Sequence, residues 1–233
     1  MYLPSIKTFL INRDFSYLVN MKITLIFLLF VFTAFGQDSP RLEQKKKASA
    51  EAKEHLKEMQ SGFLLVRLED NKAEIDYFLK YKNDTEAKRI EEKQEKINEQ
   101  IRLAFTKYFT MCPVYYFNMS DTRNLLDEKY DQVKVYDALG QTVSNVDLSA
   151  GKFYVAEFGM ANQDEVTNDE NVNSGEYNER MPLSALVIRT SKMLELRDPF
   201  PYFVRYNVMG GLKSRYLGPV KKLQDKLNAF GAY

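Results

Sequence analysis

The chain has 233 residues, and its 33 Lys and Arg residues nearly balance its 32 Asp and Glu residues. A near-neutral chain offers no overall attraction for nucleic acid or for an anionic membrane, so we expect no nucleic acid partner. The single His and single Cys exclude zinc sites built from these residues and leave a His-dependent triad with His55 as its one possible base.

Residues 1–36 are predicted to be an N-terminal extension and a cleavable signal peptide. Lys22 gives a positive start, an apolar run of about thirteen residues follows at 23–35, and the small Ala34 and Gly36 suit a cleavage site. A bilayer span needs about 20 apolar residues, so the run is too short to cross. We expect export to the periplasm or the extracellular space, with no stable membrane span after cleavage. Anchoring through uncleaved residues 23–35 is the alternative.

The segment 37–62 is predicted to form an exposed helix, because residues 41–61 are rich in Lys, Glu and Ala, which are strong helix formers. Its apolar stripe is weak, since two of its five members are alanines: Leu42, Ala48, Ala52, Leu56 and Met59.

A helical hairpin is predicted at 72–109, after a short apolar run at 63–68 that indicates a buried strand. The helices at 72–82 and 85–109 carry apolar residues at a spacing of three to four, and Asn83 supplies turn and capping chemistry between them. The charged outer face of the hairpin is typical of a solvated surface.

Strands and helices alternate in the rest of the chain. In order, we predict strand 114–117, helix 121–130, strand 133–136, strand 153–158, surface loop 161–180, strands 186–189 and 193–196, aromatic run 202–206, and a last helix with Pro219 in its first turn. This alternation favours a three-layer α/β fold with a mixed sheet, over 63–233 as a single domain that includes the hairpin. Strands 63–68 and 113–117 are a candidate parallel pair joined by crossover helices.

The order of these elements resembles that of a thioredoxin-like domain. A helix starts at Ser120 and Asp121 directly after a strand, and Pro182 precedes a strand-turn-strand unit and a closing helix. The resemblance implies that Pro182 is the counterpart of the cis-proline that faces the thioredoxin redox site. The Cys-x-x-Cys position reads Met119 to Arg123 without cysteine, and a strand and an acidic loop replace one expected helix. The resemblance therefore implies a degenerate thioredoxin-like fold without dithiol chemistry.

The export segment and the stretches 184–187 and 199–205 resemble small exported proteins of unknown role from Bacteroidota. This resemblance implies an envelope location and no particular activity.

No cofactor or metal site is predicted. The stretch 169–175 has the spacing of a calcium loop, but Ser174 stands where Gly is needed and Arg180 stands where Glu is needed. No glycine-rich nucleotide loop occurs. His55 lies in a charged helix and is predicted to be a surface histidine, and Cys112 lies in an apolar setting that favours a buried, inert thiol.

Five residues mark a candidate surface or cleft: Ser120, Asp121, Pro182, Tyr202 and Arg205. The last two belong to the aromatic segment 200–206, which favours either core packing with a rigid turn or a recognition surface. No residue is assigned a catalytic role.

We expect a non-enzymatic envelope accessory or binding protein that contacts a protein partner through the helical arm or the aromatic segment. One alternative is a degenerate thioredoxin-fold protein or a carboxylate-based enzyme, in which Asp121, Glu157 and Arg205 converge with Pro182 in one cleft. A helix-mediated dimer is a third possibility.

Overall fold

A computed structural model describes residues 40–161 and 183–232 of the chain. Its contacts divide the chain into two units, Met1–Lys47 and Ala48–Tyr233. The predicted signal peptide and Pro182 lie outside the described residues. None of the helices in the described ranges has the length and apolar character that crossing a membrane requires.

In the described part of the second unit, six strands form a mixed sheet in the order β3-β2-β1-β4-β5-β6. The strands are β1 (Phe63–Leu68), β2 (Val114–Asn118), β3 (Val135–Tyr136), β4 (Phe153–Ala161), β5 (Leu183–Thr190) and β6 (Phe203–Arg205). The three central strands β2, β1 and β4 are parallel, and the outer pairings are antiparallel. The predicted parallel pair is confirmed, with Leu64 opposite Val114.

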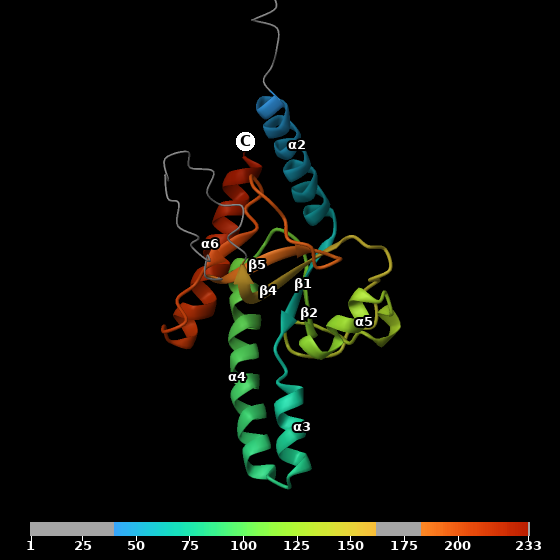
Figure 1. The fold of residues 1–233 in the computed structure, drawn as a ribbon, viewed down its shortest axis with the longest axis vertical. Coiled ribbons are helices and arrows are strands. Elements are labelled where there is room, and N and C mark those ends of the chain that lie inside the picture. Colours follow the sequence, from blue (N-terminus) through green and yellow to red (C-terminus); the bar gives the residue numbers. More distant parts are fainter. Residues whose placement is uncertain (1–39, 162–182, 233) are drawn as a thin grey trace, which may run out of the picture. The chain divides into compact units, whose positions relative to one another are not determined.

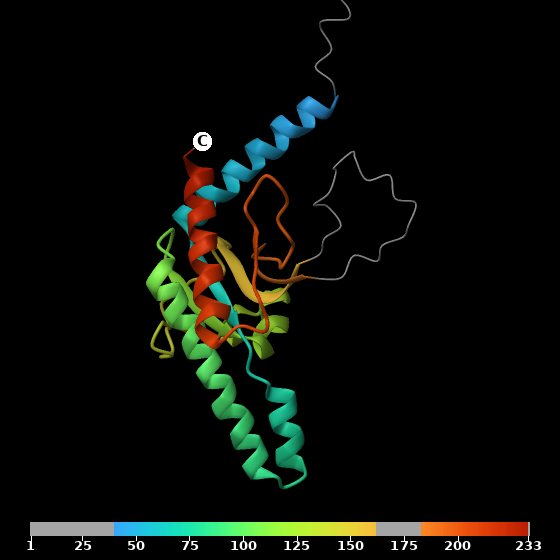
Figure 2. The ribbon, with the colours of Figure 1, turned by 90° about the vertical axis from the view of Figure 1, so that its left-hand side faces the viewer.

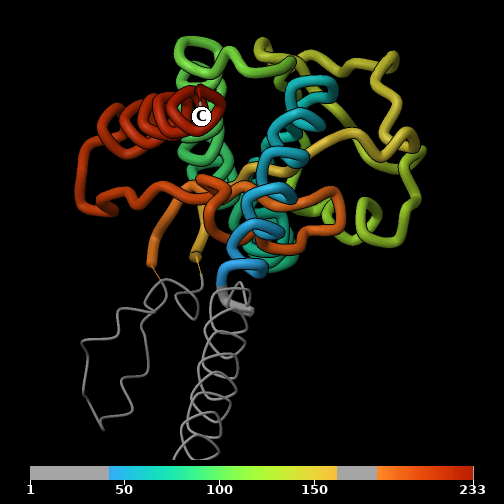
Figure 3. Tube along the Cα trace, turned by 90° about the horizontal axis from the view of Figure 1, so that it is seen from above, coloured from blue at the N-terminus to red at the C-terminus, as the bar shows by residue number. Residues whose placement is uncertain are grey.

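Helices cover both faces of this sheet, so the predicted three-layer α/β fold is confirmed. On one face α4 (Asp84–Tyr108) and α6 (Leu212–Gly231) run side by side (Figure 2 and Figure 3), over the larger apolar core that contains Leu64, Val66 and Phe105. On the other face α5 (Thr122–Leu126) covers a smaller core with Leu65 and Phe117, and Figure 1 shows it across the strands from α6. Because alternate residues of a strand point to opposite faces, each central strand feeds both cores.

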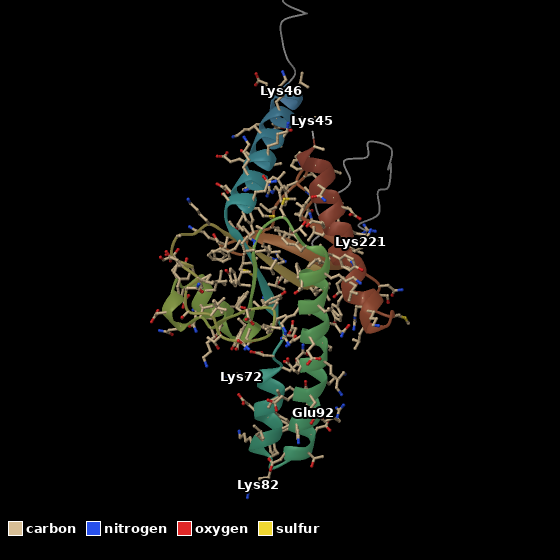
Figure 4. All side chains as sticks on the ribbon, turned by 180° about the vertical axis from the view of Figure 1, so that it is seen from behind. Lys45, Lys46, Lys72, Lys82, Glu92 and Lys221 are labelled. Atoms are coloured by element: carbon tan, nitrogen blue, oxygen red, sulfur yellow. The ribbon has the colours of Figure 1, made fainter. Side chains whose placement is uncertain are left out.

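The predicted helical hairpin is confirmed as α3 (Lys72–Lys80) and α4. Asn83 caps α4 by accepting a hydrogen bond from the Glu86 amide at 3.2 Å. Ala87 and Ile90 of α4 are buried, whereas α3 has no buried residue. The hairpin therefore projects past the carboxyl ends of the parallel strands (Figure 1). Figure 4 shows Lys82 at the far end of the hairpin.

The helix expected to be exposed at 37–62 is α2 (Pro40–Ser61), and its last turns are not exposed. Ala52, Leu56 and Met59 are 3%, 6% and 0% exposed and belong to the larger core. Their spacing is helical, and the small Ala52 lets the helix approach the core closely. The prediction treated alanines as weak members of the apolar stripe and therefore underestimated the burial of this helix.

Several predicted elements differ in length or position. The helix expected at 121–130 ends at Leu126, because Glu128 adopts a left-handed backbone with φ 58°. The strand expected at 193–196 is reduced to one bridge between Arg189 and Glu195.

Pro219 was expected in the first turn of the last helix, but α6 begins earlier, at Leu212. Pro219 thus lies inside the helix, where it removes one backbone hydrogen bond. Its neighbours Tyr216 and Val220 are buried against the core, which holds both sides of the interruption in place. Gly218 precedes the proline, so no Cβ clashes with the proline ring in a helical backbone.

Candidate functional site

A polar cleft lies where the parallel strands β1 and β2 end. Two adjoining cavities of about 560 and 300 Å³ share Asp70, Lys72 and Ser120 in their walls. In α/β folds, ligands bind outside the carboxyl ends of the parallel strands. We call these two cavities the carboxyl-edge cleft, and its lining residues are Glu69, Asp70, Asn71, Lys72, Ala73, Glu74, Ile75, Asp76, Asn118, Met119, Ser120, Asp121, Lys134 and Tyr136.

The carboxylate of Asp70 ties the two loops of the cleft together. Its Oδ2 accepts a hydrogen bond from the Ser120 amide at 3.2 Å, and its Oδ1 accepts one from the Lys72 amide at 3.4 Å. Asp121 makes a similar link, because its Oδ2 accepts from the Lys134 amide at 3.2 Å. Both aspartates therefore shape the cleft as well as line it.

A chain of amide side chains fixes the loop after β1 onto α4. Asn71, in a left-handed conformation with φ 46°, donates to Gln94 at 2.9 Å. Gln94 donates to Asn98 at 3.0 Å, and Asn98 donates to the Glu69 carbonyl at 2.8 Å. Gln94 and Asn98 are buried, at 7% and 6% exposure. Because each of the three amide groups donates to the next member of the chain, the cleft wall is held in place before any ligand arrives.

Gln94 and Asn98 were not predicted as site residues, although a signal for them is present in the sequence. Both occupy positions in the inward-facing stripe of α4, between Ile90 and Ile101. Polar residues at apolar positions of a long helix indicate a buried hydrogen-bonded network.

The cleft is rich in carboxylates. Among the described residues, its basic lining residues are Lys72 and Lys134, and they face five acidic ones: Glu69, Asp70, Glu74, Asp76 and Asp121. Burial, together with the charges of Asp121 and Asp70, raises the pKa of the Tyr136 hydroxyl. No set of three or more His, Cys, Asp or Glu side chains within residues 40–161 and 183–232 is arranged to hold a metal ion. The arrangement suits a ligand that carries positive charge or many donors.

Next to the cleft, α3 presents exposed aromatic side chains. Tyr77 and Tyr81 are 57% and 64% exposed, and their ring centroids lie 4.7 Å apart. Ala73, which lines the cleft, lies one helical turn before Tyr77. The cleft and the tyrosine pair thus form a continuous strip along one face of α3.

The five predicted site residues do not gather at one place. Ser120 and Asp121 lie in the carboxyl-edge cleft, whereas Tyr202 is buried at 4% exposure just before β6. Arg205 is exposed on β6, four strand positions from β2, which corresponds to about 19 Å between the strands. Pro182 lies outside the described residues, so its comparison with the thioredoxin cis-proline stays a prediction.

The grouping expected for a carboxylate-based enzyme is not found among its described members. Glu157 is 5% exposed and pairs with Arg67 at 2.5 Å and Arg189 at 2.7 Å. Arg189 also pairs with Glu195 at 2.8 Å. Glu157 therefore belongs to a buried ion-pair network in the sheet, and neither it nor Arg205 lines the cleft that holds Asp121.

His55 was predicted to be a surface histidine; its side chain is 35% exposed, and it also joins a part-buried polar contact that the prediction did not include. Its Nδ1 lies 2.8 Å from the Tyr154 hydroxyl, which donates to Glu58 at 2.7 Å. Because the tyrosine proton goes to Glu58, the nitrogen of His55 is the donor in the other bond. The residues are 99 positions apart, so no local sequence pattern could reveal this contact. His55, Glu58 and Tyr154 line a cavity of about 190 Å³ at the other end of the parallel strands, where β4 begins.

The thiol of Cys112 is half-buried against the larger core. Burial raises its pKa to about 12, so the thiol stays protonated at neutral pH. Its partial exposure differs from the buried position that the apolar sequence around it predicted.

No protein-family model, no curated protein and no solved structure matches this chain.

Proposed function

We propose that this chain is an exported, non-enzymatic accessory protein that binds an extended basic segment of a partner protein in the carboxyl-edge cleft and along α3. The observation that carries the proposal is the excess of carboxylates in a cleft that continues into two exposed tyrosines.

The charges favour a basic ligand over other classes. Five carboxylates outnumber two lysines in the lining, so an anionic ligand meets like charge, which costs several kcal/mol at a close contact. Lys and Arg side chains pair with carboxylates and also lie favourably over Tyr rings. Tyr77 and Tyr81 therefore extend the same preference beyond the cleft.

The rigidity of the cleft also favours binding. Asp70 joins the two loops, and the amide chain from Asn71 to Asn98 holds one of them on α4. A site whose loops are already ordered loses less conformational entropy when a ligand binds. An extended segment suits the strip because α3 lies open along its length, with no buried residue.

Fluorescence anisotropy with a short labelled peptide rich in Lys and Arg tests the proposal. The chain should bind this peptide, and binding should weaken as salt is added. A peptide of the same length with Glu in place of the basic residues should not bind.

The variant Glu74→Gln/Asp76→Asn should weaken binding about three- to tenfold, since each exposed ion pair contributes about 0.2–1 kcal/mol. Tyr77→Ser should weaken it further. Glu92→Gln is the matched control: Glu92 lies on the same hairpin, pairs with Lys88 at 3.9 Å and does not line the cleft (Figure 4). Equal binding of both peptides, or an equal loss in the control, would contradict the proposal.

A further inference from the structure

A turn of exposed apolar residues joins β6 to α6. Met209 is 91% exposed, and Val208 and Leu212 are 48% and 42% exposed. Hydrogen bonds hold this turn: the Met209 amide donates to the Asn207 side chain at 2.9 Å, and the Gly210 amide donates to the Asn207 carbonyl at 3.3 Å. We call residues 207–212 the apolar turn. Because these hydrogen bonds lie within the turn, they hold its backbone in a defined conformation with Met209 pointing outward.

The helix that follows the apolar turn is basic. It carries Lys213, Arg215, Lys221, Lys222 and Lys226, whereas its only acidic residue is Asp225. Lys221 projects from the outer face of α6 in Figure 4, and its side chain is 60% exposed. Burial raises the pKa of the Tyr206 hydroxyl, and the charge of Glu69 adds to this shift, so Glu69 is an acidic group close to the turn. The chain as a whole has a net charge of +1, so this basic excess is a local feature that composition does not reveal.

The inner face of α6 is already occupied. Tyr216, Val220, Leu223 and Leu227 are buried in the core of the domain. The apolar face of α6 is therefore not available to a new partner. The surface that this part of the chain offers for contact consists of the apolar turn and the basic outer face of α6.

We infer that the apolar turn and the basic face of α6 dock the chain on the surface of an anionic lipid bilayer. Three apolar side chains are too few for a stable protein–protein interface, which buries about 800 Å² on each partner. A bilayer surface needs less, because a few apolar side chains enter the headgroup region while basic residues act over the Debye length. Each Lys or Arg near an anionic surface strengthens binding roughly fivefold. This inference is independent of the cleft and its ligand.

A position-specific probe tests this docking. In the full chain with Cys112→Ser, an environment-sensitive fluorophore is attached at Met209→Cys. With vesicles of phosphatidylglycerol and phosphatidylcholine, its emission should shift to the blue and increase several-fold. Vesicles of phosphatidylcholine alone should give little change, and high salt should reverse the effect.

The matched control carries the probe at Leu139→Cys. Leu139 is 80% exposed and lies in a different turn. The Asp137 side chain holds that turn by accepting hydrogen bonds from the amides of Leu139 and Gln141. The control therefore tests an exposed apolar side chain that no basic helix follows. Because each probe reports its own position, an anchor at residues 23–35 would not immerse position 209. Lys221→Gln/Lys222→Gln should lower the apparent affinity at position 209 by roughly 25-fold, about fivefold for each lysine.

Three results would overturn the inference: a probe at 209 that stays in water while the chain floats with vesicles, equal shifts at 209 and 139, or equal shifts with charged and neutral vesicles. A shift produced by an added envelope protein fraction and not by vesicles would also overturn it, in favour of a protein partner. If Cys112→Ser does not fold, flotation of the unlabelled Val208→Ser/Met209→Ser variant gives the same comparison: it should bind anionic vesicles at least tenfold less well than the parent chain, and unchanged binding would refute the docking.

Discussion

The corner between α2 and β1 gives the sharpest stability prediction. Gly62 packs so closely against the backbone just before β4 that a Cβ atom would lie 2.0 Å from the Lys152 carbonyl oxygen. Real contacts of this kind are about 3.4 Å, so Gly62→Ala forces the two backbones apart by about 1.4 Å.

That displacement breaks identifiable interactions. The Phe63 amide donates to the same Lys152 carbonyl at 3.3 Å, and the Gly62 amide donates to the Met59 carbonyl at 3.3 Å. Each lost backbone bond costs about 1 kcal/mol, and loosening the fully buried Met59 adds a similar amount. We therefore expect Gly62→Ala to lower the free energy of unfolding by about 3 kcal/mol and the Tm by roughly 6–12 °C.

Urea and thermal denaturation followed by circular dichroism measure this change. Gly159→Ala is the control: its Cβ would meet the nearest Glu157 atoms at an ordinary 3.7 Å, so stability should stay equal or rise by up to about 1 kcal/mol. A Tm change below about 2 °C for Gly62→Ala, or equal losses for both variants, would refute the reasoning.

Further predictions concern buried polar groups. Glu157→Gln should cost about 3 kcal/mol in urea denaturation, because it leaves the partly buried Arg67 without its carboxylate. Glu195→Gln, which removes one contact of Arg189 at a more exposed site, should cost about 1 kcal/mol. Burial raises the pKa of Tyr116 to about 12, while the unfolded value is about 10. Between these pH values the unfolded chain loses the proton first, so stability should fall as pH rises, and Tyr116→Phe should remove that part of the fall. At pH 8 the native Cys112 thiol should react with thiol reagents roughly a thousandfold more slowly than in the unfolded chain, and equal rates would contradict the raised pKa of about 12.

The local parts of the fold were predictable, because the signals for them are local. Apolar spacing and the Asn83 turn predicted the hairpin, and short apolar runs predicted the parallel strands β1 and β2. The start of α6 was predicted wrongly, since Pro219 matches a first-turn position by sequence alone. Burial of residues on either side of it favours a longer helix, and burial depends on contacts far along the chain.

The cleft was predictable only in part. Ser120 and Asp121 follow a strand, and polar residues at the carboxyl ends of strands indicate a candidate binding site in an α/β chain. Glu69 and Asp70 complete the cleft because β1 pairs with β2, a pairing across about 50 residues that fixes which loops meet. The link between His55 and Tyr154 depends on the packing of α2 against β4 in the same way.

The two outermost strands are short, with two residues in β3 and three in β6. An exposed strand edge is a template on which a second chain can add by backbone hydrogen bonding, and its hazard grows with its length. These edges offer few free amides and carbonyls in a row. In the described part of this chain, a strand of a second molecule therefore has few backbone groups to pair with. We expect the sheet not to extend from one molecule into the next, which is the first step toward fibrils, even at high protein concentration.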